Sequence, residues 1–394
     1  MADIIPATPT IAKEVTENFT YDMAQSAMQA VIDSHAGLHE KDITFNFANG
    51  DYAATALDFS GISTASGAKL YIIGSDERDV FCDPYLKGLP SAPTMSISGQ
   101  TITVAAKDFT DVVDGQKIDV WGENAGGTVV KETLTIDSHT TTTLTVVETP
   151  TIVDTGVDGS GLVFKSSTNL AACKFKFTNP SLNVEVSNLE LKIENGVAYG
   201  SPRTLGANLT LSNCIVVDSS SGRGGKLSAN KVIFYGSQNF HSCDLALEDC
   251  YTVPQTGNTC GTFTYTRCKG TIDNIKSFLS GRIINYESDL YLDTCNLYLN
   301  AGANPHLTCS YNGKVRSKNS LFISQLATGT LAILSNYNSK IAITGGAIAY
   351  FTTGVKSEYS GKVTEYGSSV GFVSVTTNWN PVKDTVGNYG GLNE

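Results

Sequence analysis

The stretch Leu209-Thr-Leu-Ser-Asn213-Cys214 decides the fold, because close variants of it return along the chain. Each variant is a short strand of alternating apolar residues that runs into a polar corner and then into a second short strand. The other copies are Val184-Glu-Val-Ser-Asn188-Leu189, Leu227-Ser-Ala-Asn230-Lys231, Leu245-Ala-Leu-Glu-Asp249-Cys250, Phe263-Thr-Tyr-Thr-Arg267-Cys268, Leu290-Tyr-Leu-Asp-Thr294-Cys295 and Val315-Arg-Ser-Lys-Asn319-Ser320.

These copies recur at intervals of about 22 residues on average, which is typical of a parallel β-helix, a solenoid in which each coil pairs in register with the next. Like residues then stack. We expect one corner ladder of Asn188, Asn213 and Asn319, with Asn230 as a further candidate, because asparagine tolerates the left-handed backbone of a sharp corner. The next position gives a ladder of Cys214, Cys250, Cys268 and Cys295, buried as small apolar residues. An antiparallel sandwich is the alternative fold, but hairpin signals are sparse.

Working outward, the pattern divides the chain into five segments. Apolar residues spaced three and four apart predict a helix from Thr20 to His35, and alternating strands follow it. Residues 91–150 have the texture of a small antiparallel sandwich or barrel inserted into the solenoid. The predicted segments are an N-terminal arm (1–17), a capping helix with the first coils (18–90), the inserted module (91–150), the parallel β-helix (151–358) and a C-terminal capping segment (359–394). The predicted fold is therefore all-β.

Composition excludes several functions. The 394 residues carry a formal net charge of −11, which gives no electrostatic basis for a sequence-independent grip on nucleic acid. No apolar stretch reaches the length of a membrane span, and the N-terminus lacks the pattern of a cleaved signal peptide. We expect neither nucleic-acid binding nor membrane insertion.

The sequence also predicts no cofactor and no metal site. The five histidines have no metal-ligand spacing, and the nine cysteines contain no Cys-x-x-Cys. Most cysteines are expected to be reduced, although a disulfide among Cys243, Cys250, Cys260 and Cys309 stays open. The glycine-rich segment 221–226 lacks the spacing of a phosphate-binding loop.

Catalysis is a further possibility for this fold, because a groove on a β-helix with two carboxylates about 5 to 10 Å apart can hydrolyse a glycosidic bond. The candidate acids are Asp244, Glu248, Asp249, Asp273, Glu287, Asp289 and Asp293. Of these, Asp244, Asp273, Glu287 and Asp289 are kept as candidates for such a pair. Exposed acids are equally expected on any solvated β-helix face, so no catalytic residue is assigned. Tyrosines in the same stretch could stack on sugar rings or pack between coils.

The N-terminal part carries a family resemblance. The helix that runs into Ile43-Thr-Phe-Asn-Phe47 and Ala48-Asn-Gly-Asp-Tyr52, followed by Leu70-Tyr-Ile-Ile-Gly74, resembles the entry to the pectin-lyase-like right-handed β-helices of bacteriophage tailspikes and tail fibres. The module at 91–150 is similar to small β modules of phage tail proteins. The resemblance is one of pattern over roughly residues 18–375. A lyase-type cluster of Asp, Arg and Lys is not found, and the helix region is shorter than in large depolymerase tailspikes.

The resemblance implies a virion structural protein, a homotrimeric tail spike or tail fibre subunit that attaches to a host-surface glycan or protein. It would be assembled in the host cytoplasm and would join other tail or baseplate proteins through its N-terminal region. Two alternatives stay open. One is a polysaccharide depolymerase, which makes enzymatic activity an undecided question, and the other is a capsid or baseplate decoration protein without a receptor.

Overall fold

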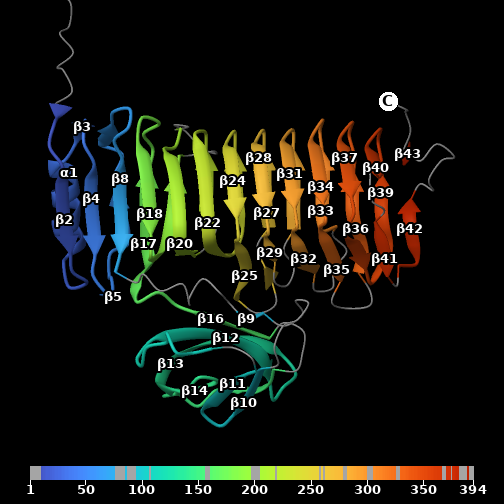
Figure 1. Cartoon of the computed structure of the whole chain (residues 1–394), viewed down its shortest axis with the longest axis horizontal. Helices are drawn as coiled ribbons and strands as arrows, with labels where there is room; N and C mark the ends of the chain where they lie inside the picture. The colour runs from blue at the N-terminus through green and yellow to red at the C-terminus, as the bar shows by residue number, and fades with distance from the viewer. Residues whose placement is uncertain are drawn as a thin grey trace, which may run out of the picture.

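A right-handed parallel β-helix forms most of the molecule, and a small antiparallel module lies along one side of it (Figure 1). The computed structural model describes residues 10–75, 85–86, 95–105, 108–155, 160–196, 205–217, 220–256, 259–260, 262–277, 282–299, 305–324, 329–365, 370–373, 375–380 and 388–389. The predicted fold class is confirmed, and the antiparallel sandwich is not the fold of the repeated segment.

The solenoid has three faces. The first, which we call the front face, consists of parallel strands paired in register. They are β2 (Val15–Phe19), β4 (Ile43–Phe47), β8 (Leu70–Gly74), β18 (Asn183–Ser187), the first halves of β20 (Asn208–Val216) and β22 (Lys226–Tyr235), β24 (Asp244–Glu248), β28 (Lys269–Asp273), β31 (Asp289–Asp293), β34 (Lys314–Lys318), β37 (Lys340–Thr344) and β40 (Lys362–Glu365).

The other two faces complete each coil. The second face holds β5 (Gly50–Asp51), the start of β17 (Thr168–Phe177), the start of β19 (Glu190–Asn195), the ends of β20 and β22, β25 (Tyr251–Thr256), β29 (Lys276–Ser277), β32 (Asn296–Leu299), β35 (Leu321–Ser324), β38 (Ala347–Ala349) and β41 (Gly371–Val373). The third holds β6 (Ala56–Asp58), the ends of β17 and β19, β21 (Ser220–Arg223), β23 (Gln238–His241), β27 (Thr262–Thr266), β30 (Arg282–Tyr286), β33 (Leu307–Ser310), β36 (Gly329–Ser335), β39 (Phe351–Ser357) and β42 (Thr377–Asn380).

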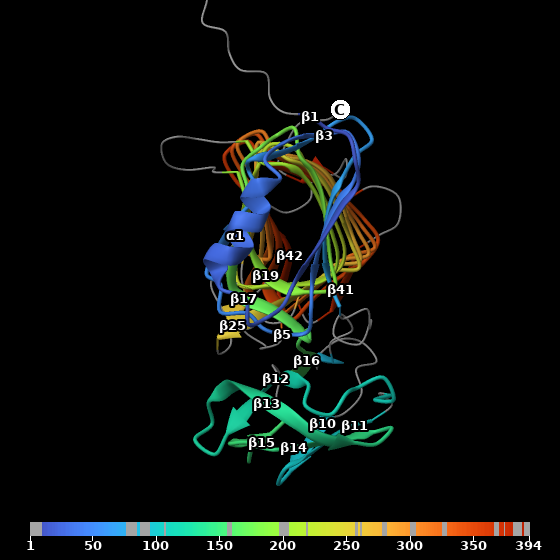
Figure 2. The same ribbon diagram turned by 90° about the vertical axis from the view of Figure 1, so that its left-hand side faces the viewer.

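Helix α1 (Gln25–Ser34) covers the first coil at the N-terminal end (Figure 2). It begins at Gln25 rather than near Tyr21, and Thr20 bonds to Asp22 instead of capping the helix. Met28 and Ile32 face the core, while Gln29 exchanges two hydrogen bonds of 2.9 Å with the backbone of Asp58. The helix therefore closes the apolar end of the solenoid and satisfies the exposed edge of β6.

Both ends of the chain differ from the prediction. Val15–Phe19 is not part of an arm, because it pairs in parallel with Ile43–Phe47, and β1 (Thr10–Ile11), β3 (Gly37–His39) and β7 (Ile62–Thr64) form a further small sheet. Within 359–394, β40 and β42 continue the coils, and β43 (Asn388–Tyr389) pairs antiparallel to β40. Residues 1–9, 366–369, 374, 381–387 and 390–394 of the predicted end segments lie outside the described residues.

The inserted module is an antiparallel sheet. Its strands are β9 (Tyr85–Leu86), β10 (Met95–Ser98), β11 (Thr101–Val104), β12 (Lys117–Asn124), β13 (Val129–His139), β14 (Thr143–Val146), β15 (Ile152–Asp154) and β16 (Gly161–Phe164). The sheet thus extends beyond 91–150, since β16 pairs with β12. Outside the module, β26 (Thr259–Cys260) pairs antiparallel with β25 of the solenoid.

A buried charge cluster joins this module to the solenoid. Asp119 of the module is fully buried, lies 3.7 Å from Lys165 Nζ and accepts a hydrogen bond of 3.0 Å from the Tyr235 hydroxyl of the solenoid. Lys165 also lies 2.5 Å from the buried Glu190. Burial works to raise the pKa of Asp119, but Lys165 and Lys131 outweigh it and hold that pKa below its usual value. Apolar side chains of both parts share one core around this cluster.

Candidate functional site

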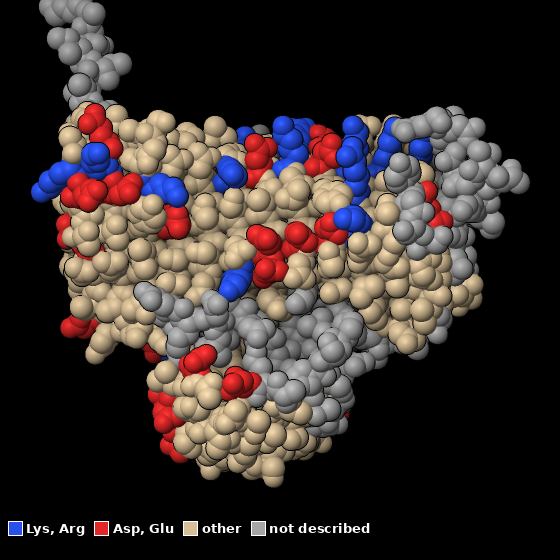
Figure 3. Space-filling model, viewed as in Figure 1, with Lys and Arg blue, Asp and Glu red and all other residues tan. Residues whose placement is uncertain are grey.

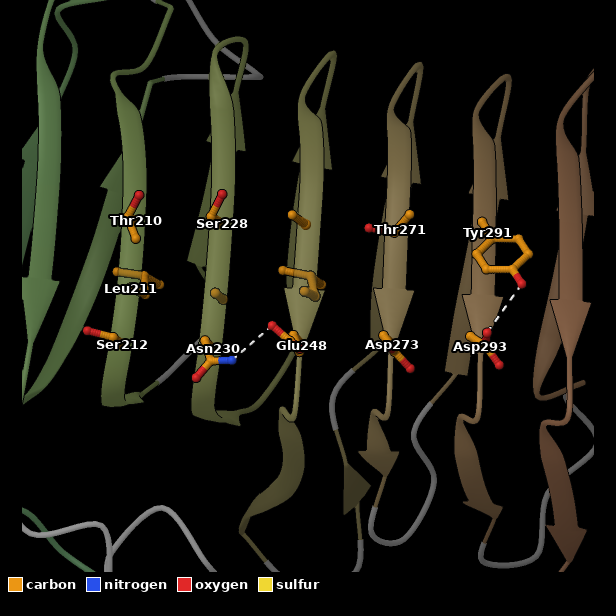
Figure 4. A pocket seen from close by; sticks show the side chains of 13 residues that line it. Thr210, Leu211, Ser212, Ser228, Asn230, Glu248, Thr271, Asp273, Tyr291 and Asp293 are labelled. Atoms are coloured by element: carbon orange, nitrogen blue, oxygen red, sulfur yellow. Dashed lines mark hydrogen bonds between the residues drawn. The ribbon is translucent and has the colours of Figure 1, made fainter. Parts of the chain in front are cut away.

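A groove of about 490 Å³ lies on the front face, across strands β20, β22, β24, β28 and β31 (Figure 4). Because side chains alternate along a strand, two outward positions per coil line it. The middle position carries small side chains in four coils, Thr210, Ser228, Ala246 and Thr271, and then Tyr291. The small side chains leave the hollow, and the Tyr291 ring bounds its end toward the C-terminus.

The outward position at the end of each front-face strand gives the groove a row of polar groups. From coil to coil it holds Ser212, Asn230, Glu248, Asp273 and Asp293, in register with one another. Adjacent coils are about 4.8 Å apart, so three carboxylates follow one another along the solenoid axis. Asn230 donates a hydrogen bond of 3.1 Å to Glu248.

Asp293 is the most strongly held acid of the row. It accepts hydrogen bonds of 3.2 Å from the Tyr291 hydroxyl and from Lys318 Nζ, and one of 3.0 Å from Thr294. Burial works to raise its pKa, but the bonds from Thr294 and Lys318 prevail and hold the pKa below its usual value. Hydroxyls, an amide and carboxyl groups in a shallow groove, with one aromatic ring, are the groups that bind the hydroxyls and rings of sugars.

The structure does not bring the four predicted acids together. Asp273 lies in the groove. Asp244 and Asp289 occupy the other edge of the front face, each in register with lysines of neighbouring coils. Glu287 lies at a corner, where its carboxylate is 2.7 Å from Arg267 Nε. Glu248 and Asp293, which the sequence also offers as candidate acids, complete the row with Asp273, and both end strands of the quoted repeat.

The corner between the front and second faces contains the expected left-handed residues. Positive φ values from 48° to 62° occur at Asn188, Asn213, Lys231, Asp249, Asn274, Thr294 and Asn319. Asn213 donates to the Asn188 side chain at 2.9 Å. Asn230 is not in this ladder, because it pairs with Glu248 one position earlier and Lys231 takes the corner.

The cysteine ladder also differs from the expectation in one member. Cys214, Cys250 and Cys295 follow this corner and bury their thiols at one level of the core. Cys268 instead follows the corner between the third and front faces, beside Cys243. All four are free thiols, as are Cys243 and Cys309 of the disulfide candidates; the Cys260 side chain lies outside the described residues.

An aromatic ladder that the sequence analysis missed lies at that corner between the third and front faces. The rings of Tyr311, Tyr337 and Tyr359 stack in parallel, with centroids 4.8 Å and 5.0 Å apart and interplanar angles of 3°. Their residues are 49%, 41% and 68% exposed. The available signal was a short motif, because Tyr-Asn-Gly-Lys (311–314), Tyr-Asn-Ser-Lys (337–340) and Tyr-Ser-Gly-Lys (359–362) are copies of one corner.

Charge is distributed unevenly along the front face (Figure 3). The outward position at the start of each front-face strand holds lysine and aspartate in alternation and then lysine alone. The residues are Lys226, Asp244, Lys269 and Asp289, followed by Lys314, Lys340 and Lys362. Basic groups therefore gather beside the tyrosine ladder, and acidic groups gather in the groove.

Among the residues that the structure describes, no group of three or more His, Cys, Asp or Glu side chains is arranged to hold a metal ion. No helix among these residues is both long and apolar enough to cross a bilayer.

Among known proteins, the chain is similar only to solved structures. No protein-family model matches the sequence, and no curated protein matches it. The Gp54 tailspike of Acinetobacter baumannii bacteriophage AP22, solved with a capsular saccharide, aligns over 89% of this chain at 11% identity and a TM-score of 0.24. The tailspike gp49 of Pseudomonas phage LKA1 aligns over 89% of this chain and 74% of its own, at 12% identity and a TM-score of 0.22.

The tailspike gp61 of Pseudomonas phage phi297 covers 88% of this chain and 73% of its own, at 13% identity and a TM-score of 0.19. This chain spans 66% of the Gp54 tailspike chain, just under two thirds. At TM-scores below 0.5, these likenesses carry no argument about what the chain does, and the functional argument rests on the groove and the corner ladders themselves.

Proposed function

We propose that this chain is the subunit of a bacteriophage tail spike or tail fibre that attaches the particle to a glycan on the host surface. The observation that carries the proposal is the groove on the front face, lined by hydroxyls, Asn230 and the carboxylates of Glu248, Asp273 and Asp293, with Tyr291 at its end. The pattern resemblance of the sequence to phage β-helices supports the same role. The finer parts of the proposal are a homotrimeric assembly, attachment to other tail or baseplate proteins through the N-terminal region, and a place on the virion.

The architecture suits such a role. A solenoid with its coils paired in register holds the groove residues at fixed spacing, so a bound glycan meets a prepared row of partners. Weak contacts along the row, repeated in each subunit of a trimer, add through multivalency.

A panel of bacterial capsular and O-antigen polysaccharides tests the proposal. We expect the purified chain to bind a small subset, and the double variant Glu248→Gln/Asp273→Asn to lose most of that affinity. A matched control is Glu185→Gln, on the same face but outside the groove lining. Absence of binding to every polysaccharide and to intact bacterial cells would overturn the proposal and favour a decoration protein without a receptor. Light scattering tests the trimer, which a monomeric mass would contradict.

The carboxylate row favours a second function, glycoside hydrolysis. Glu248 and Asp273 are register partners on adjacent strands, and a separation of about 5 Å between two carboxyl groups is that of retaining glycosidases. The test is incubation of a bound polysaccharide with the chain, followed by assays for new reducing ends and for unsaturated sugars, which elimination produces and hydrolysis does not. New reducing ends without unsaturated sugars, abolished by Asp273→Asn, would establish hydrolysis, and no release over hours would eliminate it.

A further inference from the structure

The corner between the third and front faces repeats one arrangement in three successive coils. In each coil an exposed tyrosine is followed by two small or polar residues and then by a lysine that begins the next front-face strand. The tyrosines stack, and Lys314, Lys340 and Lys362 are register partners. Two parallel rows result, one of phenol rings and one of ammonium groups, which we call the Tyr–Lys rows.

The tyrosines at this corner are not explained by packing of the core. Tyr311, Tyr337 and Tyr359 have φ values of 53°, 49° and 47°, a backbone region that a bulky residue seldom adopts. Their rings remain largely exposed. In the coils before them the corner between the same two faces has a single left-handed residue, Ser242, Arg267 or Glu287, so a solenoid corner does not require tyrosine.

Ring orientation decides what this surface offers. Because the rings stack along the solenoid axis, their faces are turned toward one another, and their edges and hydroxyls point outward. The edge of an aromatic ring is its positive part, and a phenol hydroxyl donates a hydrogen bond. Both features favour an anionic partner over a neutral one.

The row of lysines also favours an anionic partner. In the preceding coils, Asp244 and Asp289 alternate with lysines in the same column, so neighbouring coils offset each other's charge. In the last three coils the alternation stops, and Arg316 and Lys318 add positive charge on β34. Lys318 also contacts Asp293 of the groove, at 3.2 Å. Lysines at successive coils, about 4.8 Å apart, present a continuous row of positive charge to which a polyanion can bind.

We infer that the Tyr–Lys rows bind an acidic polysaccharide, with sugar carboxylates on the lysines and ring hydroxyls on the tyrosines. The inference rests on the proposed attachment function and names its ligand class. The groove on the front face, with its row of carboxylates, would bind the uncharged hydroxyls of the same polymer. Long-chain nucleic acid, the other polyanion, is disfavoured by the net charge of −11.

Immobilised polygalacturonate is a suitable probe, with neutral dextran and double-stranded DNA as comparison surfaces. We expect the full chain to bind polygalacturonate more weakly as salt rises, and to bind neither of the other two. The variant Lys340→Gln/Lys362→Gln should weaken this binding about fivefold to tenfold, as expected for two charge contacts at the protein surface. The matched control is Lys226→Gln/Lys269→Gln, two lysines of the same column in coils without the tyrosines, and it should change affinity less than twofold.

The tyrosines are tested in the same way. Tyr337→Ser should weaken polygalacturonate binding. Tyr350→Ser should not, although Tyr350 is also exposed (45%) with a φ of 63°, because it lies outside the stack. Circular dichroism and light scattering on every variant show whether fold and assembly are kept.

Several results would overturn the inference. These are equal binding to dextran, equal binding to DNA, an unchanged affinity of Lys340→Gln/Lys362→Gln, or loss of the assembled mass in the tyrosine variant, which would make the rows a subunit interface. Retained attachment to bacterial cells with no polygalacturonate binding would overturn the acidic-ligand inference and leave the attachment function standing. Loss of all glycan and cell binding would instead refute the attachment function.

Discussion

His306 makes the stability of the solenoid depend on pH in a way that one substitution removes. The side chain is fully buried, packs edge-on against Phe351 and Phe322, and neither ring nitrogen has a hydrogen-bond partner among the residues that the structure describes. Burial lowers its pKa from 6.5 to about 3. The folded state therefore holds the neutral ring, whereas the unfolded chain takes up a proton as the pH falls below 6.5.

The direction and the size of the stability change with pH follow from proton linkage. A histidine whose pKa is depressed in the folded state contributes its full stability above the unfolded pKa and loses it as the pH falls toward the folded value. Each pH unit in that window costs about 1.4 kcal/mol, so from pH 7 to pH 4 the loss is about 3 kcal/mol. His306→Leu cannot take up this proton. Its stability relative to the natural chain should therefore rise by about 3 kcal/mol over the same range.

Urea unfolding at pH 7 and pH 4, with equilibrium approached from both the folded and the unfolded side, measures this difference. Many other groups titrate over this range, and comparing the two chains at each pH cancels their contributions. His139→Leu serves as the control, because His139 lies at the surface of the module, 2.9 Å from Asp114. A difference between His306→Leu and the natural chain that stays constant from pH 7 to pH 4 would refute the assignment of His306 as a buried neutral base.

Three more predictions concern the packing of the coils. Gly270→Ala should destabilise the solenoid by about 2 kcal/mol or more in urea unfolding, because its Cβ would lie 2.0 Å from the Leu245 carbonyl oxygen; a change within error would contradict the register there. Asp119→Asn should lower the free energy of unfolding by about 3 kcal/mol and make the module sensitive to limited proteolysis, because it leaves Lys165 with only one of its two acid partners, Glu190. Resistance to the protease equal to that of the natural chain would contradict a role of the charge cluster in holding the module. Cys250 and Cys295, with pKa values raised by burial to about 12, should resist iodoacetamide at pH 8 until urea is added, as read by peptide mass mapping. Labelling of either in the native protein would show that the ladder opens.

The sequence was sufficient for the fold because a solenoid repeats its pattern many times, so an error in one coil does not alter the architecture. Individual ladders were harder. Phe263–Cys268 looks like Leu245–Cys250, since in both an alternating strand is followed by a left-handed residue and a cysteine, yet the two lie at different corners. A pattern of apolar residues does not state which face it belongs to. That ambiguity is why Cys268 was placed in the wrong ladder.

The groove was only partly predictable for a related reason. Asp273 ends a strand whose apolar pattern is weak, because Gly270 occupies an inward position in register with Leu245. The quoted repeat skips that strand, so it does not show that Glu248, Asp273 and Asp293 are neighbours. It does not show the tyrosine ladder either, because the three tyrosines follow third-face strands that lack the pattern of the repeat. In both cases the missing information is the register between coils, which hydrogen bonding in three dimensions fixes.

Register pairing also shapes how such a protein changes over evolutionary time. The segment 337–358 runs from one stacked tyrosine to the residue before the next, and it forms one whole turn whose two edges have the same hydrogen-bonding pattern. Tandem duplication of such a segment inserts a turn that both neighbours can accept, and its deletion lets them pair with each other. The length of the aromatic and lysine rows is thus a heritable quantity that changes in whole steps, while the rest of the solenoid is left undisturbed.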